Sequence, residues 1–385
     1  MKNPHALLRA ADQIAAVESL RRLDDVGMLY EMDVSWDYYQ VPKELLPVLG
    51  AGCSTFFVPN MSGEPVMYRN YDYRHYPRND RSKDITNVAV VVHAHNPRAK
   101  YRSVGVSDAF WLDRSEGRMI TGSLDDGVTD ISALALSPYL CMDALNEAGL
   151  AVSIMALSVR ADWNEIDYEE GLRRAQEPYK LHFTLETPGE TPSPTAKGSS
   201  VGSVALNRAD KKAWLCSKVC PAQNVPGRPN TSHTLLMRMM IDRCATVDEA
   251  LALAGSFNVC CALPGSDFHV MVCDRSGRSV VLEWVGDELK VVEAACCTNY
   301  RLSYEDGFRG DDRRYECLKA GLERFPRAMP EDLGELLLRF VAQVPGQSAD
   351  RSKTLFSSVY NTVKGTLRLF LFGDFSRSWS FGIDG

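Results

Sequence analysis

Pairs of short strand-like segments, far apart along the chain and divided by helical segments, are the feature that most constrains the fold. The first pair is the clearest: residues 53–58 and 65–70 are rich in β-branched and aromatic side chains, and the turn formers of residues 59–63 separate them. This pattern predicts an antiparallel hairpin. Further strands are expected at residues 150–157, 268–273, 279–284 and 288–294, and a last hairpin at residues 354–360 and 366–372.

Helical segments fill the stretches between these strands. Apolar side chains recur at helical spacing between residues 5 and 24. Thr246 and Glu249 have the spacing of a capping box, and Pro330 suits the start of a helix. Gly149 suits the C-terminal end of a helix that precedes it. The sequence therefore predicts helices at residues 5–24, 138–148, 232–244, 247–256, 312–324 and 330–343.

The order of these elements indicates the fold class. Hairpins separated by pairs of helices differ from the regular strand–helix–strand alternation of parallel sheets, so we expect antiparallel sheets packed by helices, an α+β arrangement. Residues 187–203 are rich in Pro, Gly, Ser and Thr and poor in apolar side chains. They predict a mobile surface loop that need not divide two domains.

Charge and composition exclude several classes of protein. Lys and Arg number 43 against 50 Asp and Glu, a net charge of −7, which argues against a nucleic-acid partner because such proteins need a basic face. No stretch approaches the roughly 18 apolar residues of a membrane span, and early charges such as Asp12 interrupt any signal peptide. The eleven cysteines, an odd number, include two adjacent pairs and fit a reducing compartment. We expect a soluble, cytoplasmic protein.

Neither a metal nor a cofactor is predicted. Cys216 and Cys220 are separated by three residues, but no second pair of Cys or His side chains lies at ligand spacing. No glycine-rich phosphate loop joins a strand to a helix. The chemistry has to come from ordinary side chains.

The first hairpin brings candidate groups together. A turn centred near residues 61 and 62 pairs Cys53 with about residue 70, so Arg69 and Asp72 should lie across from the thiol. A nearby arginine lowers the pKa of a thiol and makes it nucleophilic, and Asp72 is suited to orienting an amine. The alternative from spacing alone is an ordinary Arg69–Asp72 ion pair beside a buried, apolar Cys53.

The motif around this cysteine resembles a family. Gly52-Cys53-Ser54-Thr55, with Arg69 and Asp72 downstream, is similar to the cysteine N-terminal-nucleophile hydrolases. These include bile-salt (choloylglycine) hydrolases, penicillin V acylases, acid ceramidase, N-acylethanolamine acid amidase and isopenicillin N acyltransferase. The resemblance spans residues 53–385 in the same order, through residues 146–152, 268–283, 298–300, 311–315 and 354–360.

The resemblance implies a four-layer αββα fold and a precursor that cuts itself between Gly52 and Cys53. Residues 1–52 would then be a pro-segment and a partner of the catalytic domain, residues 53–385. Gly52 has no Cβ and tolerates a strained peptide. The α-amine freed by cleavage, with an ordinary pKa near 8, can serve as the base for its own thiol. No catalytic histidine is then required, and His269, in a strand pattern, is expected to be structural.

The resemblance also implies a role for each site residue. Cys53 would be the nucleophile, Arg69 would stabilise its thiolate or contact substrate, and Asp72 would orient the α-amine. Asn299 would donate its amide to the oxyanion of the tetrahedral intermediate. The family arginine matches Arg313 by its spacing from Asn299 and Arg314 by the aromatic residue that follows, so we keep both.

Two departures bear on the choice of subfamily. Bile-salt hydrolases carry an oxyanion Asn where this chain has Met155-Ala156, so a backbone N–H must substitute there. The segment 1–52 is more similar to the pro-segments of ceramidase-like and acyltransferase-like members, since bile-salt hydrolases mostly lack one.

These residues together predict an amidase that hydrolyses linear carbon–nitrogen bonds of small N-acyl amides. We expect an apolar acyl chain to be buried near the site, at about 0.8 kcal/mol per methylene. The alternatives are an acyltransferase that passes the acyl group to an amine, and a catalytically silent binding protein of the same fold. The exact substrate, retention of the pro-segment and homo-oligomer formation stay open. The expected substrate contacts are Phe57, Trp111, Met155 and Ala156.

Overall fold

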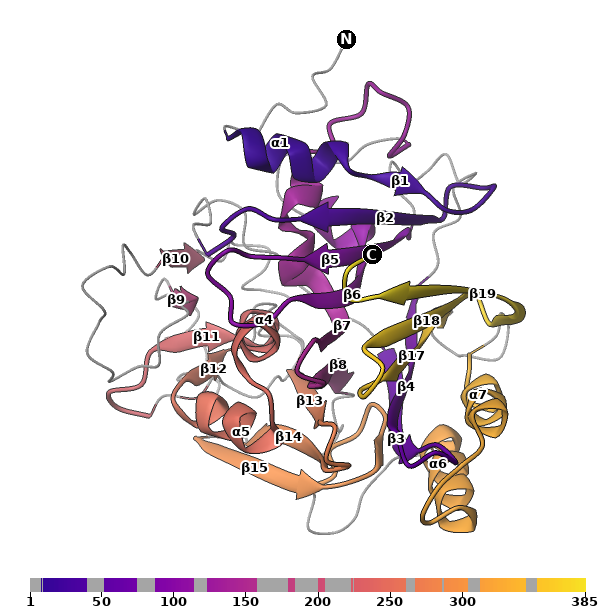
Figure 1. Ribbon diagram of the computed structural model, residues 1–385. Coiled ribbons are helices and arrows are strands. Elements are labelled where there is room, and N and C mark those ends of the chain that lie inside the picture. Colours follow the sequence, from indigo (N-terminus) through magenta and orange to yellow (C-terminus); the bar gives the residue numbers. More distant parts are fainter. Residues whose placement is uncertain are drawn as a thin grey trace.

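Two large sheets form the body of this protein in a computed structural model (Figure 1). The structure describes residues 8, 10–39, 52–74, 87–113, 123–157, 179–183, 200–204, 223, 225–260, 267–285, 287–303, 312–343 and 352–385. All but one of the neighbouring strand pairs in the two large sheets run antiparallel. The predicted α+β class with antiparallel sheets is therefore confirmed.

The larger sheet has nine strands, in the order β1-β2-β5-β6-β7-β8-β13-β14-β15. Only β2 and β5 pair in parallel within it. Its strands are β1 (Arg21–Arg22), β2 (Leu29–Val34), β5 (Ala89–Ala94), β6 (Ser103–Asp108), β7 (Cys141–Asn146), β8 (Ala151–Leu157), β13 (Asp267–Cys273), β14 (Ser279–Val285) and β15 (Glu288–Glu293).

The second sheet has six strands, in the order β16-β3-β4-β17-β18-β19. They are β16 (Cys296–Cys297), β3 (Gly52–Pro59), β4 (Pro65–Arg74), β17 (Ser352–Asn361), β18 (Thr366–Leu371) and β19 (Asp374–Gly382). A small third sheet contains β9 (Tyr179–Phe183), β10 (Ser200–Val204), β11 (Asn230–Ser232) and β12 (Asn258–Cys260).

Helices cover the outer faces of both large sheets. Helix α4 (His233–Arg243) packs on β7, β8 and β13, and α5 (Val247–Gly255) packs on β13. On the far side, α6 (Arg313–Arg324) lies against β3 and β16, and α7 (Glu331–Phe340) lies against β4. Because β3 and β8 contact each other between the sheets, the order is helix, sheet, sheet, helix, as predicted. Two 3₁₀ helices, Ala109–Asp113 and Ser132–Leu140, and helix α1 (Ala11–Glu18) complete the described elements.

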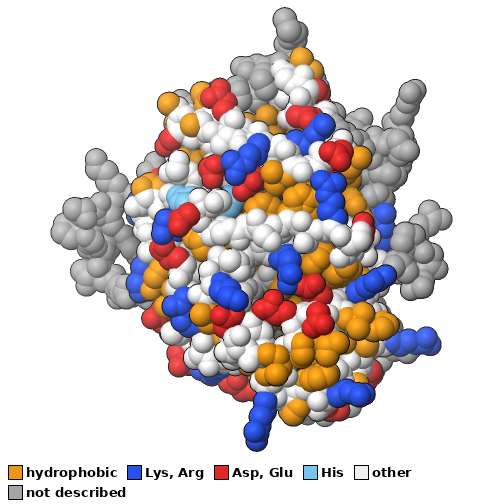
Figure 2. All heavy atoms as spheres, turned by 45° about the vertical axis from the view of Figure 1, so that its right-hand side comes forward, with side chains coloured by type: hydrophobic (Ala, Val, Ile, Leu, Met, Phe, Trp, Pro, Cys, Tyr) orange, Lys and Arg blue, Asp and Glu red, His pale blue; other side chains and the backbone are white. Residues whose placement is uncertain are grey.

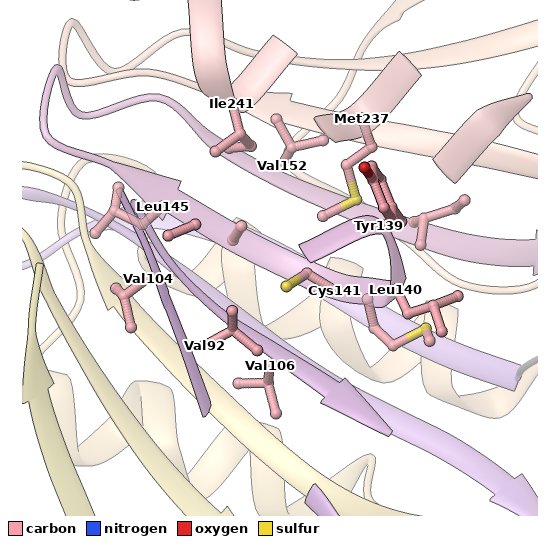
Figure 3. Close-up of a cluster of buried hydrophobic side chains, with 14 of the residues drawn as sticks. Val92, Val104, Val106, Tyr139, Leu140, Cys141, Leu145, Val152, Met237 and Ile241 are labelled. Atoms are coloured by element: carbon pink, nitrogen blue, oxygen red, sulfur yellow. The ribbon is translucent and has the colours of Figure 1, made fainter. Parts of the chain in front are cut away.

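Apolar side chains fill the spaces between these layers. Figure 3 shows side chains from β5 to β8 packed with Met237 and Ile241 of α4. A separate cluster between the six-stranded sheet and α6 and α7 includes Tyr68, Leu318 and Leu338. On the face drawn in Figure 2, the described positive and negative side chains are interspersed. None of the described helices is both long and apolar enough to cross a membrane.

Most predicted elements are present, with α4 to α7 and strands β13, β14, β15, β17 and β18 within a few residues of their expected bounds. The helix predicted at residues 138–148 is wrong, because this segment ends a 3₁₀ helix and then forms strand β7. Every residue of β7 is buried, so its sequence lacks the alternation of a half-exposed strand. Gly149 is a turn glycine at φ +88° rather than a helix end.

Three other expectations need adjustment or fall partly outside the described residues. Of the helix predicted at residues 5–24, the described part is Ala11–Glu18, and residues 5–7 and 9 lie outside the described residues. The helix ends before residue 24 because the chain turns into β1 to pair with β2. Most of the loop predicted at residues 187–203 lies outside the described residues, and its last residues belong to β10. Cys216 and Cys220 also lie outside the described part of the chain.

Candidate active site

Cys53 lies at the start of β3, between β16 and β4 of the six-stranded sheet. Its cross-strand partner is Tyr71, and Gly52 pairs with Asp72. The predicted partner, at about residue 70, is within one residue of the observed one. The hairpin places Arg69 and Cys53 on the same face, because Arg69 lies two residues from Tyr71 along β4.

The thiol of Cys53 is fully buried and contacts the Arg69 guanidinium. Arg69 Nη2 lies 3.0 Å from Cys53 Sγ, and neither residue is exposed. Burial raises the pKa of the Cys53 thiol, and the charge of Arg69 offsets only part of that increase. In the intact chain the thiol is therefore a weaker acid than the arginine alone would make it.

A buried carboxylate fixes Arg69 from the opposite side. Asp143 Oδ2 lies 3.2 Å from Arg69 Nη1, and both side chains are inaccessible to solvent. Arg69 Nη2 also donates to the Ile154 carbonyl at 2.7 Å. Sequence reasoning missed Asp143, although a lone charge inside the apolar run of residues 141–145 was a signal. Buried charges of this kind are normally paired.

The backbone nitrogen of Cys53 is the second centre of the site. It donates to Asn299 Oδ1 at 3.2 Å, and Arg314 Nη2 donates to the same oxygen at 2.7 Å. These two donors fix the orientation of the amide, so Asn299 Nδ2 faces β8 and donates to the Ala156 carbonyl at 2.6 Å. Arg314 also reaches the Cys53 carbonyl, at 3.4 Å.

Asp72, the cross-strand partner of Gly52, is the third residue around the Cys53 backbone. Its carboxylate accepts from Arg314 Nη1 at 2.9 Å, Gln343 Nε2 at 3.2 Å and Thr354 Oγ1 at 2.5 Å. Burial raises the pKa of Asp72, while Arg314 and the hydrogen bonds act in the opposite direction. Sequence reasoning missed both Gln343 and Thr354. Thr354 is the cross-strand partner of Asp72 in the β4–β17 pair.

The structure separates the two candidate arginines. Arg313 begins α6 and its side chain is exposed. Arg314 is one position further round the helix, and it contacts Asp72, Asn299 and Cys53 with its side chain 20% exposed. Asp312 caps the helix through the backbone N–H groups of residues 314 and 315. That cap sets which of the two side chains points inward.

The four expected substrate contacts lie in different surroundings. Phe57, Trp111 and Met155 are buried in the core, where the Trp111 indole donates to Tyr71 Oη at 2.7 Å and Met155 packs against Cys297. Ala156 is partly exposed and contacts Asn299 through its carbonyl. Of the four, Ala156 makes a direct hydrogen bond to Asn299, and Trp111 binds Tyr71, the cross-strand partner of Cys53.

Together the fold and the site define a two-sheet α+β protein whose polar groups converge on the sulfur and the backbone nitrogen of one buried cysteine. Among the described residues, no histidine contacts Cys53. A thiol with its own nitrogen held nearby can act as a nucleophile once that nitrogen becomes a free amine.

Solved structures similar to this chain include enzymes of three kinds. They include a variant of conjugated bile acid hydrolase from Clostridium perfringens, at 12% identity over 86% of this chain and 93% of that chain, with a TM-score of 0.47. Penicillin V acylase from Agrobacterium tumefaciens has 14% identity, 83% coverage of each chain and a TM-score of 0.45. The Caenorhabditis elegans ortholog of N-acylethanolamine-hydrolyzing acid amidase has 14% identity, 80% and 93% coverage and a TM-score of 0.39.

These names are among the enzymes that the sequence motifs resemble. No family model matches the chain, and no curated protein matches it. At these identities and TM-scores, the chemistry has to be argued from the chain's own residues.

Proposed function

We propose that this protein is a self-processing cysteine amidase that hydrolyses linear amide bonds of small N-acylated molecules. The observation that carries the proposal is that two polar side chains contact different atoms of Cys53. Arg69 contacts its sulfur at 3.0 Å, and Asn299 Oδ1 accepts from its backbone nitrogen at 3.2 Å. A papain-type thiol needs a histidine base. A cysteine that becomes the chain terminus supplies the base itself.

Self-cleavage is the first step of this proposal. Cys53 Sγ adds to the Gly52 carbonyl carbon, the Gly52–Cys53 C–N bond breaks, and the thiol proton passes to the Cys53 nitrogen. Water then hydrolyses the thioester, which leaves a carboxylate on Gly52 and a free thiol and amine on Cys53. Residues 1–52 become the pro-segment and residues 53–385 the catalytic chain.

Amide hydrolysis then uses the same atoms. The α-amine takes the thiol proton, sulfur attacks the substrate carbonyl, and the amine product leaves with that proton. Asn299 Nδ2, which donates to the Ala156 carbonyl of β8, would donate to the developing oxyanion. Asp72 and Arg314 would hold the α-amine through their contacts around residue 53. Water finally releases the acyl group from the thioester.

The test combines intact mass with activity. Denaturing mass spectrometry should find wild-type protein cut between Gly52 and Cys53, Cys53→Ala intact, and the half-buried Cys317→Ala control cut like wild type. N-acyl amino acids of increasing chain length, N-acylethanolamines, penicillin V and conjugated bile salts form the substrate panel. We expect kcat/KM to rise with acyl length, and Cys53→Ala to be inactive.

Two results would contradict the proposal. An active wild-type protein that stays intact would exclude the N-terminal nucleophile, and a cleaved Cys53→Ala would exclude its sulfur as the agent. Repeating the assay with an added amine measures acyl transfer, because an acyltransferase would convert the thioester to a new amide rather than an acid.

A further inference from the structure

A second buried ionisable pair lies close to the site and has no part in the chemistry above. His269 on β13 and Glu283 on β14 are cross-strand partners, and Nδ1 of the imidazole lies 3.0 Å from Glu283 Oε1. Neither side chain is exposed. Burying such a pair costs desolvation free energy, which good geometry and further hydrogen bonds offset.

The contacts of this pair bracket Asn299. His269 Nε2 lies 2.7 Å from the carbonyl oxygen of Thr298, the residue before Asn299. Glu283 accepts the backbone N–H of Leu302 at 2.7 Å and that of Ser303 at 2.9 Å. One buried pair thus holds the chain on both sides of the oxyanion donor.

The same turn is linked to the site arginine. The Thr298 hydroxyl donates to the Asp312 carboxylate, and Asp312 accepts the N–H of Arg314 at 3.1 Å. The nine-stranded sheet is therefore connected through Thr298 to both Asn299 and Arg314. Glu283, Thr298 and Asp312 are each less than a tenth exposed, so water has little access to these bonds.

The hydrogen-bond geometry assigns the protons of this pair. Both nitrogens of His269 face acceptor atoms, so each is assigned as a donor. Burial alone would raise the pKa of Glu283, but the bonds and charge of His269, with the N–H groups of Ser303 and Leu302, lower it. The carboxylate is ionised and can accept all three donors.

We propose that His269 and Glu283 are positioning residues that hold the turn at residues 298–303, so that Asn299 Nδ2 meets the oxyanion in the transition state. This proposal rests on the proposed amidase function. It predicts a loss of kcat, since a misplaced oxyanion donor weakens the transition state more than it weakens substrate binding. His269 acts through Asn299 and does not touch substrate.

A double-mutant cycle tests this. His269→Gln alone should lower kcat on the order of 10- to 100-fold, the effect of a displaced catalytic group, with KM changed less than about twofold. In an Asn299→Ala background the same substitution should cost less than about threefold, because the group it positions is gone. Independent, multiplicative losses would overturn the proposal.

A matched control separates positioning from stability. His93 and Glu31 form a second buried pair, with His93 Nε2 at 2.8 Å from Glu31 Oε1, on strands β5 and β2 away from Cys53. His93→Gln should lower the melting temperature about as much as His269→Gln and leave kcat unchanged. A fall in kcat that tracks the melting temperature in both variants would contradict the proposal.

A readout besides activity keeps the two proposals distinguishable. Glu283→Gln should speed hydrogen exchange at the Leu302 and Ser303 amides while the rest of β13 and β14 stays protected. Unchanged exchange at both amides would refute the positioning role. A wild-type protein that cleaves no N-acyl amide would refute the proposed function, and the exchange result would still decide whether this pair holds the turn.

Discussion

At the residue scale, two opposing effects act on Cys53. The positive charge of Arg69 favours the thiolate, and complete burial favours the neutral thiol. Burial has the larger effect, so the pKa of the thiol rises above its ordinary value. The sequence spacing correctly predicted that Arg69 lies near the thiol. It could not compare the effect of that charge with the effect of desolvation, because burial depends on the second sheet and on the helices.

The raised pKa of Cys53 predicts how self-cleavage depends on pH. If the thiolate attacks Gly52, the rate should rise about tenfold per pH unit across the neutral range and should not level off below the ordinary thiol pKa of 9.0. Mass spectrometry of intact protein, incubated at a series of pH values, measures this rate. Cys53→Ala serves as the blank, and a plateau near neutral pH would show that the thiol is already ionised.

The two neighbouring arginines offer a paired test. Arg314→Ala should lower turnover on the order of 100-fold, because it leaves the buried Asp72 carboxylate without its cation and frees Asn299 Oδ1. Arg313→Ala changes only an exposed side chain and should keep turnover within about twofold. Steady-state kinetics on the best N-acyl amide compares them, and equal losses would mean that α6 presents a different face.

At the element scale, the β7–β8 hairpin is the part of the fold that sequence reasoning misassigned. Its turn, residues 146–149, has the composition of a helix end, yet the Asn146 side chain binds the carbonyls of Ile241 and Cys244 at the end of α4. The same side chain accepts the N–H of Leu150 at 2.9 Å. One asparagine therefore joins the turn to the covering helix and fixes β8, which carries Ala156.

This turn predicts a large effect of a small substitution. A Cβ on Gly149 would lie 2.5 Å from the Thr362 carbonyl oxygen at φ +88°, whereas Gly63, at φ +79°, has nothing within 4 Å. Gly63→Ala should cost about 1–2 kcal/mol for the backbone conformation alone. We expect Gly149→Ala to lower the free energy of unfolding by at least about 1 kcal/mol more than Gly63→Ala, because the new Cβ would clash with the Thr362 backbone carbonyl, which cannot shift easily. Urea unfolding compares the two, and equal losses would mean that the turn relaxes.

At the scale of the whole molecule, two described strands that precede Cys53 in sequence, β1 and β2, belong to the nine-stranded sheet. Strand β2 pairs with β5 along its full length, and Figure 1 shows the two strands side by side. The hydroxyl groups of Tyr38 and Tyr39 bind the buried Asp242 of α4, each with a contact of 2.9 Å. A chain cut before Cys53 would keep all of these contacts.

We therefore expect the cleaved pro-segment to stay bound. Both fragments should coelute in native size exclusion and separate only in denaturant. Tyr38→Phe combined with Tyr39→Phe should lower the urea concentration at which the fragments separate, because the Asp242 carboxylate loses both hydroxyl donors and, among the described side chains, keeps Arg238. Tyr68→Phe, which removes a buried hydroxyl without a hydrogen-bond partner, is the matched control. Release of the pro-segment in native buffer would contradict this expectation.

The sequence by itself predicted the α+β class, the first hairpin and the grouping of Arg69, Asp72 and Asn299 around Cys53. These follow from local pattern: strand periodicity, turn formers and a short motif are all encoded within a few residues. The contacts of Arg314 rather than Arg313 with Asp72 and Asn299, the pairing of Arg69 with Asp143 and the raised pKa of Cys53 are visible only in the tertiary structure. Each depends on groups far apart in sequence that burial brings together, and desolvation and the orientation of a helix cannot be read from spacing along one chain.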